Sequence, residues 1–167
     1  PVKQYTAHVT LLELLTSDVM RICLRIDGTT TLRFHAGQYI NIVLADGVRR
    51  SFSFATAPHL TGEIELHVRL VPGGRFTPGV FSQMKVGDML RFEGPLGAFS
   101  LRESGDKPII FVAGSTGFAP VKSMLEHAFH KGLNRRMILY WGVRSRSDLY
   151  LGKLAEQWAR EHANFTF

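Results

Sequence analysis

Residues Pro108–Pro120 read PIIFVAGSTGFAP, and this stretch decides the fold of the second half of the chain. Its opening apolar run is typical of a strand buried on both faces of a parallel sheet. A glycine-rich turn, Gly114–Gly117, follows, and apolar spacing in Pro120–Lys131 predicts a helix that ends at Gly132. Strand, glycine turn and helix in this order favour a nucleotide-binding unit, although the glycines do not follow the G-x-G-x-x-G spacing.

The residues after this stretch continue the same alternation. Arg136–Val143 predicts a second strand, Leu149–His162 a second helix, and Asn164–Phe167 the start of a third strand. The order indicates a doubly wound parallel sheet, so we assign residues 108–167 to an incomplete α/β nucleotide-binding domain. Phe165 and Phe167 are expected at its unpaired edge.

The residues before this stretch are short, alternating and rich in turn signals. Six strands at this spacing predict an antiparallel β-barrel over residues 1–103, joined to the α/β domain by Glu103–Lys107. A short helix is expected over Gly79–Met84, with Thr77 as its cap and Pro78 at its first position. The predicted strands are Tyr5–Leu15, Val19–Ile26, Tyr39–Leu44, Arg49–Phe54, Glu63–Leu70 and Met89–Glu93.

Composition narrows the class of protein. The 167 residues carry a net charge of +6 and are 45% hydrophobic, which is ordinary for a globular chain. Apolar runs stay far below the roughly 20 residues that span a bilayer, so no membrane insertion is expected. The single cysteine, Cys23, cannot form an intramolecular disulfide or a cysteine cage, which favours a reducing, cytoplasmic location. His127 and His130 lack further ligands nearby, so no metal site is predicted.

Three motifs carry candidate chemistry. Arg50-Ser51-Phe52-Ser53 ends a strand, where an arginine suits a phosphate and an aromatic ring suits a flat ring system; the alternative is an ordinary strand end. Gly73-Gly74-Arg75-Phe76-Thr77 suits an anion, or is a hairpin before a capped helix. Gly114-Ser115-Thr116-Gly117-Phe118-Ala119-Pro120 suits a pyrophosphate, or is simply a tight turn.

Together these motifs resemble the ferredoxin–NADP reductase-like flavoproteins. Phe34–Tyr39, Gly94–Phe99 and Trp141–Arg144 extend the resemblance over essentially the whole chain. The nearest groups are bacterial NAD(P)H–flavin and multicomponent-oxygenase reductases and the reductases acting on glucoseen sugar nucleotides. The resemblance implies FAD at the barrel, with FMN or free flavin as alternatives, and NADH or NADPH over the second domain.

The resemblance also implies roles for individual residues. Arg50 binds the flavin phosphate, Phe52 stacks on the isoalloxazine in place of the more frequent tyrosine, and Ser53 lies near flavin N5 as the candidate catalytic residue. Ser115 replaces a usual glycine, which tightens the nucleotide turn. The other cofactor-binding residues are Ser51, His67, Val68, Arg69, Gly73, Gly74, Arg75, Phe76, Thr77, Gly114, Thr116, Gly117, Pro120 and Arg144.

The function implied is hydride transfer from NAD(P)H to flavin N5, followed by electron transfer to a separate acceptor. That acceptor is an iron–sulfur protein, an oxygenase component or a small molecule such as free flavin. One alternative is a flavin-binding module without catalysis. Another is a basic nucleic-acid-binding barrel, but this reading leaves the α/β segment unexplained, so no nucleic-acid partner is expected.

Overall fold

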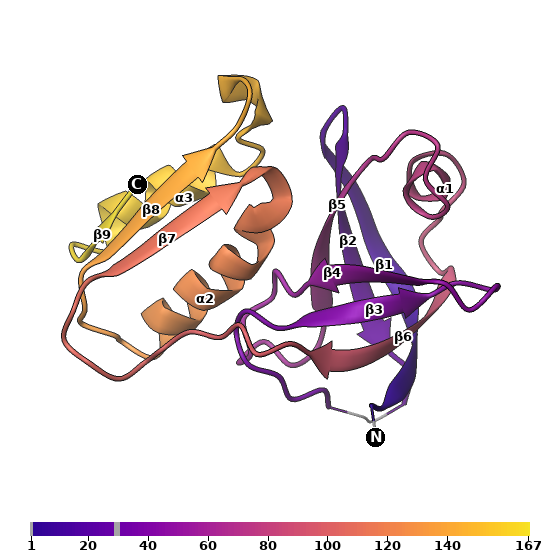
Figure 1. Cartoon of the computed structure of the whole chain (residues 1–167), viewed down its shortest axis with the longest axis horizontal. Helices are drawn as coiled ribbons and strands as arrows, with labels where there is room; N and C mark the ends of the chain where they lie inside the picture. Colours follow the sequence, from indigo (N-terminus) through magenta and orange to yellow (C-terminus); the bar gives the residue numbers. More distant parts are fainter. Residues whose placement is uncertain (1, 29–30) are drawn as a thin grey trace.

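Alternating apolar side chains build the first part of the molecule. The computed structural model describes residues 2–28 and 31–167, and Figure 1 shows a barrel beside an α/β layer. The barrel is one antiparallel six-stranded sheet in the order β4-β3-β6-β1-β2-β5. Its strands are β1 (Gln4–Thr16), β2 (Val19–Ile26), β3 (Tyr39–Val43), β4 (Arg49–Ser53), β5 (Ile64–Arg69) and β6 (Met89–Leu96).

The inward side chains of these strands form the first hydrophobic core. It is fully buried at its centre, where large apolar groups meet from five strands and the residue after β4. Burial of this kind is the main favourable contribution to folding. The central side chains are Val9, Ile22, Leu24, Ile40, Ile42, Phe54, Leu66, Val68 and Phe92.

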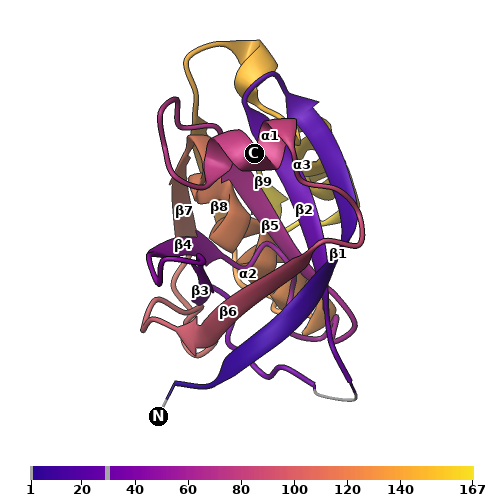
Figure 2. The ribbon, with the colours of Figure 1, turned by 90° about the vertical axis from the view of Figure 1, so that its right-hand side faces the viewer.

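A short helix, α1 (Thr77–Ser82), lies at one end of the barrel (Figure 2). The expected cap is wrong: Phe76 holds the N-cap position, and Thr77 and Pro78 are the first two helical residues. The hydroxyl of Thr77 instead accepts a 2.8 Å hydrogen bond from the backbone N–H of Val71. The Thr77 side chain therefore closes the preceding turn and does not form the helix cap that the sequence pattern predicts.

The barrel is not closed by a continuous ladder. β4 and β5 are the two ends of the sheet order and lie side by side. The backbone N–H of Ala55 donates to the carbonyl of Glu65 at 2.9 Å, just beyond the end of β4. The edges of β4 and β5 away from this bond are free to face a ligand, because an edge strand has backbone groups without ladder partners.

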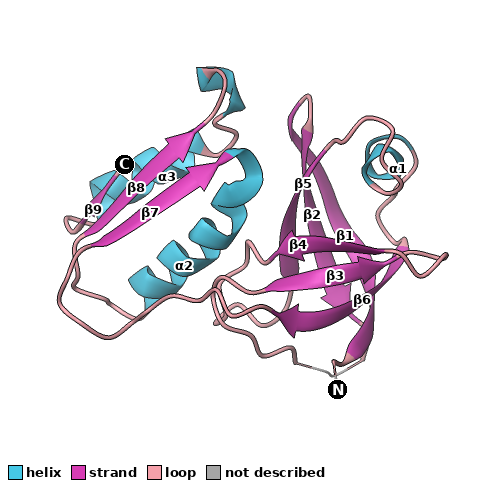
Figure 3. Cartoon of the chain, viewed as in Figure 1, coloured by secondary structure: helices cyan, strands magenta, loops and turns pink. Residues whose placement is uncertain are grey.

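The second part is a three-stranded parallel sheet with two helices, as Figure 3 shows by colour. The strand order β7-β8-β9 follows the chain, with a helix in each crossover. A short 3₁₀ turn, Ser115–Gly117, joins β7 to α2, and another, Arg146–Asp148, precedes α3. The elements are β7 (Ile109–Gly114), α2 (Phe118–His130), β8 (Met137–Gly142), α3 (Gly152–Glu161) and β9 (Phe165–Thr166).

Both helices pack against the same face of this sheet. Phe111 and Ala113 of β7 are buried beneath them, whereas Ile110 and Val112 are 61% and 78% exposed. The expectation that the apolar run is buried on both faces is therefore wrong for this chain. Phe165 is also buried, packed on Phe129 and Trp158 rather than lying open at the edge.

Helix α2 lies between the parallel sheet and the barrel (Figure 1). Its Ser123 hydroxyl donates to the carbonyl of Thr56 at 2.6 Å, which ties it to the segment after β4. The guanidinium of Arg135 donates to the carbonyls of Arg102 and Lys107, at 2.6 and 2.7 Å, and so holds the connecting segment. Within the described residues, no helix is long and apolar enough to cross a membrane.

Candidate functional site

A cavity of about 630 Å³ opens where β4, β5 and the turn before α2 meet. It brings together most of the residues singled out from the three motifs, which are far apart in sequence. Val71 and Ala119 also line it but were not among the predicted binding residues, since neither has a side chain with its own chemical signal. The expected residues that line it are Arg50, Ser51, Phe52, Ser53, His67, Arg69, Gly74, Arg75, Phe76, Thr77, Thr116, Gly117 and Pro120.

Arg50 gives this cavity an available positive charge. Its guanidinium donates to the carbonyl of Arg49 at 2.9 Å and forms no ion pair with any carboxylate of residues 2–28 and 31–167. Arg49 is instead bonded to Glu93, and Arg75 pairs with Asp46 at 2.9 Å. An arginine at a cavity wall with no carboxylate partner suits a phosphate, which its planar fork can bind in bidentate fashion.

Two aromatic rings give the cavity an apolar wall. Phe52 and Phe76 lie with ring centroids 5.6 Å apart and planes at 53°. Phe52 is half-buried against the barrel core, and it pairs across β3 with the fully buried Ile40. The alternation expected for β4 therefore places Phe52 on the inner face of the sheet, and Phe52 also lines the cavity. A flat ring system can pack on such a wall.

Gly74 and Thr77 shape the turn rather than offering free donors. The N–H of Gly74 donates to the carbonyl of Val71 at 2.9 Å, and a Cβ added at Gly74 would lie 2.9 Å from that oxygen. Thr77 bonds the N–H of the same Val71. Both groups thus already have partners within the turn, and the anion contact expected of them stays a prediction.

A second cavity, of about 380 Å³, lies at the carboxyl ends of β7 and β8. Gly114, Ser115 and Arg144 line it, as expected, together with Asp18 and Asp148, which were missed. Arg69 lines both cavities, so the two sites adjoin. Ligands of open α/β sheets bind at this end of the strands.

The turn at Ser115 is strained. Ser115 has φ +48°, in the left-handed region that glycine adopts at no cost and other residues adopt at roughly 1–2 kcal/mol. Its carbonyl accepts a 2.9 Å hydrogen bond from the indole N–H of Trp141, and its hydroxyl accepts one of 3.3 Å from Arg69. The serine that replaces the usual glycine thus keeps the glycine conformation.

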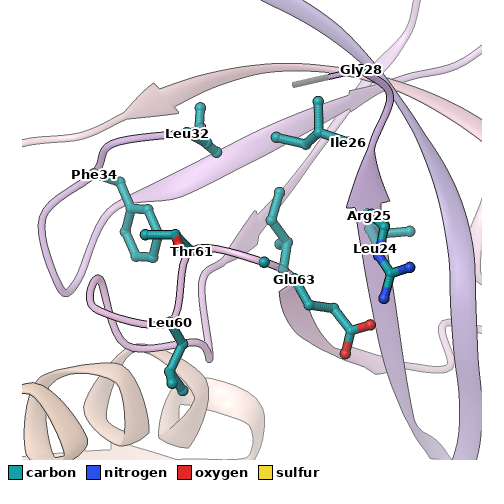
Figure 4. A pocket seen from close by; sticks show the side chains of 11 residues that line it. Leu24, Arg25, Ile26, Gly28, Leu32, Phe34, Leu60, Thr61 and Glu63 are labelled. Carbon is teal, nitrogen blue, oxygen red and sulfur yellow. The ribbon is translucent and has the colours of Figure 1, made fainter. Parts of the chain in front are cut away.

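Two of the expected residues line neither cavity. The side chain of Val68 is buried in the barrel core, because it alternates with the outward-facing residues of β5. Gly73 lies in the turn with φ +71° and has open space around its Cα. A third cavity, of about 600 Å³, opens on the barrel beside Phe34 and Glu63 and contains none of the expected residues (Figure 4).

A buried polar cluster lies beside the first cavity, and nothing in the sequence pattern indicated it. Glu65 of β5 meets His67, Lys122 and Arg21. Burial alone would raise the pKa of Glu65, but the hydrogen bond from His67 and the charges of Lys122, His67 and Arg21 lower it to about 2. Burial lowers the pKa of the His67 imidazole, against the opposing effect of its hydrogen bond to Glu65.

The geometry defines a class of protein: a barrel whose open seam shares a cavity with the glycine turn of an adjoining parallel sheet is typical of a nucleotide-dependent flavoprotein. Two family models match this chain. The oxidoreductase FAD-binding domain matches residues 6–101, and the oxidoreductase NAD-binding domain matches residues 111–167. The chain therefore belongs to the FAD-binding oxidoreductase family, as the resemblance predicted, and the predicted fold class and cofactors are confirmed at this level.

Several curated relatives are named as reductases. The chain is 41% identical over 165 residues to the CDP-6-deoxy-L-threo-D-glycero-4-hexulose-3-dehydrase reductase of Yersinia pestis, covering 99% of this chain and 49% of that protein. It is 38% identical over 169 residues to the phenol 2-monooxygenase reductase component DmpP of Pseudomonas sp. strain CF600, covering 100% and 47%. The chain thus spans about half the length of these relatives.

Solved structures agree on the fold. The Amycolatopsis cytochrome P450 reductase GcoB superposes with a TM-score of 0.89 at 37% identity, over 99% of this chain and 50% of that one. A ferredoxin NADP⁺ reductase from Neisseria gonorrhoeae with bound FAD and NADP superposes with a TM-score of 0.83 at 19% identity, over 99% and 67%. The second likeness shows the fold alone.

Proposed function

We propose that the cavity between β4, β5 and the α2 turn holds the flavin of FAD, and that the cavity at the ends of β7 and β8 receives NADH or NADPH. The observation that carries this proposal is that the two cavities adjoin at Arg69. A nicotinamide and a flavin must stack closely for a hydride to pass between them, and adjoining sites allow that contact. We further propose that residues 1–103 and 108–167 are the two domains.

The chain's own residues orient and enclose the reactants. Arg50 binds the flavin phosphate, Phe52 and Phe76 form the wall on which the ring packs, and Ser53 donates or relays a proton at flavin N5. The Ser115 turn receives the pyrophosphate of the nicotinamide nucleotide beside Arg144. Bound FAD supplies the hydride-accepting chemistry, and the protein supplies position and exclusion of water.

The electron acceptor lies outside these 167 residues. The only cysteine, Cys23, is buried, and burial raises the pKa of its thiol to about 12. One cysteine cannot supply the several thiolates that hold an iron–sulfur cluster. Relatives named as reductase components of a phenol monooxygenase and a terephthalate dioxygenase support a separate oxygenase or iron–sulfur protein as acceptor, with free flavin as the alternative. The cytoplasm is the compartment we propose for this reaction.

Anaerobic mixing tests the proposal. FAD is added to the apoprotein, unbound flavin is removed, and NADH or NADPH is added in a stopped-flow instrument. Retained yellow colour that bleaches with either nucleotide supports the proposal. If flavin is retained but neither nucleotide bleaches it, even over hours, the protein is a flavin-binding module without catalysis. If no flavin is retained, the assignment of the first cavity is overturned.

A further inference from the structure

A chain of buried polar groups crosses the seam between the barrel and the α/β domain. Glu65 of β5 is its central acceptor: one carboxylate oxygen accepts from Nε2 of His67 at 2.7 Å, and the other accepts from Nζ of Lys122 at 3.2 Å. Lys122, in α2, also donates to the carbonyl of Ala55 at 3.3 Å. Nδ1 of His67 accepts from the hydroxyl of Tyr150, 2.9 Å away, in the segment before α3.

These bonds come from two separate elements of the α/β domain. Lys122 reaches the barrel from α2, and Tyr150 reaches it from the segment between β8 and α3. Two contacts at different points restrain rotation as well as translation of one domain against the other. The side chains of His67 and Lys122 are 0% and 7% exposed, so a lost partner leaves a buried polar group unsatisfied.

The same elements line the first cavity. β5 contributes His67 and Arg69 to its wall, and α2 begins in the turn that contributes Thr116, Gly117 and Pro120. Lys122 follows Pro120 by two residues in the same rigid helix. A shift of α2 relative to β5 therefore changes the width of the cavity directly.

We propose that Glu65, Lys122 and Tyr150 are positioning residues, which hold the Thr116–Pro120 turn at a fixed distance from β5 and so set the gap in which flavin and nicotinamide meet. The inference rests on the proposed function for its ligand. It assigns no direct contact with flavin to these three side chains. Their effect passes through the backbone of β5 and the first turn of α2.

Two variants test it against two matched controls. Tyr150→Phe removes one hydroxyl and keeps the ring that packs edge-on against Trp141, 5.0 Å between centroids. Lys122→Met removes the buried charge and keeps most of the chain length. The controls are Tyr140→Phe and Lys153→Met, which change exposed residues of the same domain.

Three measurements separate positioning from plain stabilisation. The first is FAD affinity from quenching of flavin fluorescence, and the second is the absorption band shape of bound flavin at saturation. The third is hydrogen exchange of β5 and the first turn of α2 without flavin. We expect FAD to bind about three- to tenfold more weakly in Tyr150→Phe, with a band closer to that of free flavin and faster exchange, and both controls to match the wild type.

A lower melting temperature with unchanged affinity, band shape and exchange would show that the network only stabilises the fold, and would overturn the proposal. If Lys122→Met does not fold, Tyr150→Phe decides alone. If the wild type binds no FAD, the proposed function fails, whereas the exchange measurement still decides whether the network restrains the seam. Unchanged hydrogen exchange in Tyr150→Phe counts against the positioning role, whether or not the wild type binds FAD.

Discussion

The guanidinium of Arg69, the last residue of β5, donates a 3.3 Å hydrogen bond to the hydroxyl of Ser115 in the nucleotide turn. This bond joins the strand beside the proposed flavin cavity to the turn beside the proposed nucleotide cavity. The same Arg69 pairs with Asp18 at 2.9 Å, so its orientation is set from the barrel side. The φ +48° conformation of Ser115 is strained, and in this conformation its hydroxyl accepts the hydrogen bond from Arg69.

Replacing Ser115 with glycine removes both the strain and the hydroxyl. Relief of the φ +48° conformation outweighs the loss of one half-exposed hydrogen bond and the extra entropy of unfolded glycine, so we expect Ser115→Gly to leave stability equal or up to about 1 kcal/mol higher. Ser115→Val, which is β-branched, should cost about 1–3 kcal/mol. Urea unfolding of the two variants measures the free energy of unfolding. A clearly lower value for Ser115→Gly than for the wild type would contradict the strain at this residue.

Arg50→Ala should weaken FAD binding about ten- to a hundredfold. The guanidinium lines the proposed flavin cavity and pairs with no carboxylate of the described residues, and a charge-assisted phosphate contact is worth on the order of 1.5–3 kcal/mol. The control is Arg91→Ala, an exposed arginine on β6 that does not line this cavity. Equal flavin retention in the Arg50 variant and the control, measured by equilibrium dialysis, would remove Arg50 from the site.

Local pattern is enough to predict most of the barrel and the α/β elements, because apolar alternation and glycine turns are local properties. The Glu65–Lys122 pair is different: its members are 57 residues apart, and a lysine beside the buried face of a helix has no local signature of burial. His67 is similar. Alternation alone places it on the outer face of β5, where Tyr150 and Phe118 of the α/β part pack against it.

Stability should fall as the pH drops from about 4.5 towards 2. The pKa of Glu65 is 4.5 unfolded and about 2 folded, because His67, Lys122 and Arg21 outweigh the opposing effect of burial. Below pH 4.5 the unfolded chain takes up a proton that the folded chain refuses, so the contribution of Glu65 is complete above that pH and is lost through this window.

Urea midpoints at several pH values between 6 and 2.5 measure this dependence. The slope should be shallower in Glu65→Gln than in the wild type. Glu103→Gln is the control: its carboxylate also has a lowered pKa, through its hydrogen bond to His127, but it is 45% exposed and should matter less. Equal slopes in all three proteins would mean that Glu65 is not the dominant group.

The open face of the parallel sheet should make a protein of these 167 residues associate and should leave its second domain less protected than its barrel. Ile110, Val112 and Tyr140 are 61%, 78% and 61% exposed on adjacent strands, which is an apolar patch on a sheet of only three strands. β9 is a two-residue edge strand, and among the residues that the structure describes it pairs with β8 on one side only. Amide exchange is therefore expected to be faster in β8 and β9 than in β1 and β2.

The variant Val112→Thr keeps a β-branched residue in the strand and removes apolar surface from the patch. We expect it to lower self-association, measured by sedimentation velocity over a range of concentrations. Val86→Thr is the control, because Val86 is 63% exposed on the barrel, away from this sheet. Because the same domain carries the nucleotide turn, loose packing here should also slow flavin reduction by NADH or NADPH. Brisk bleaching at micromolar nucleotide, together with protection equal to that of the barrel, would show that three strands suffice.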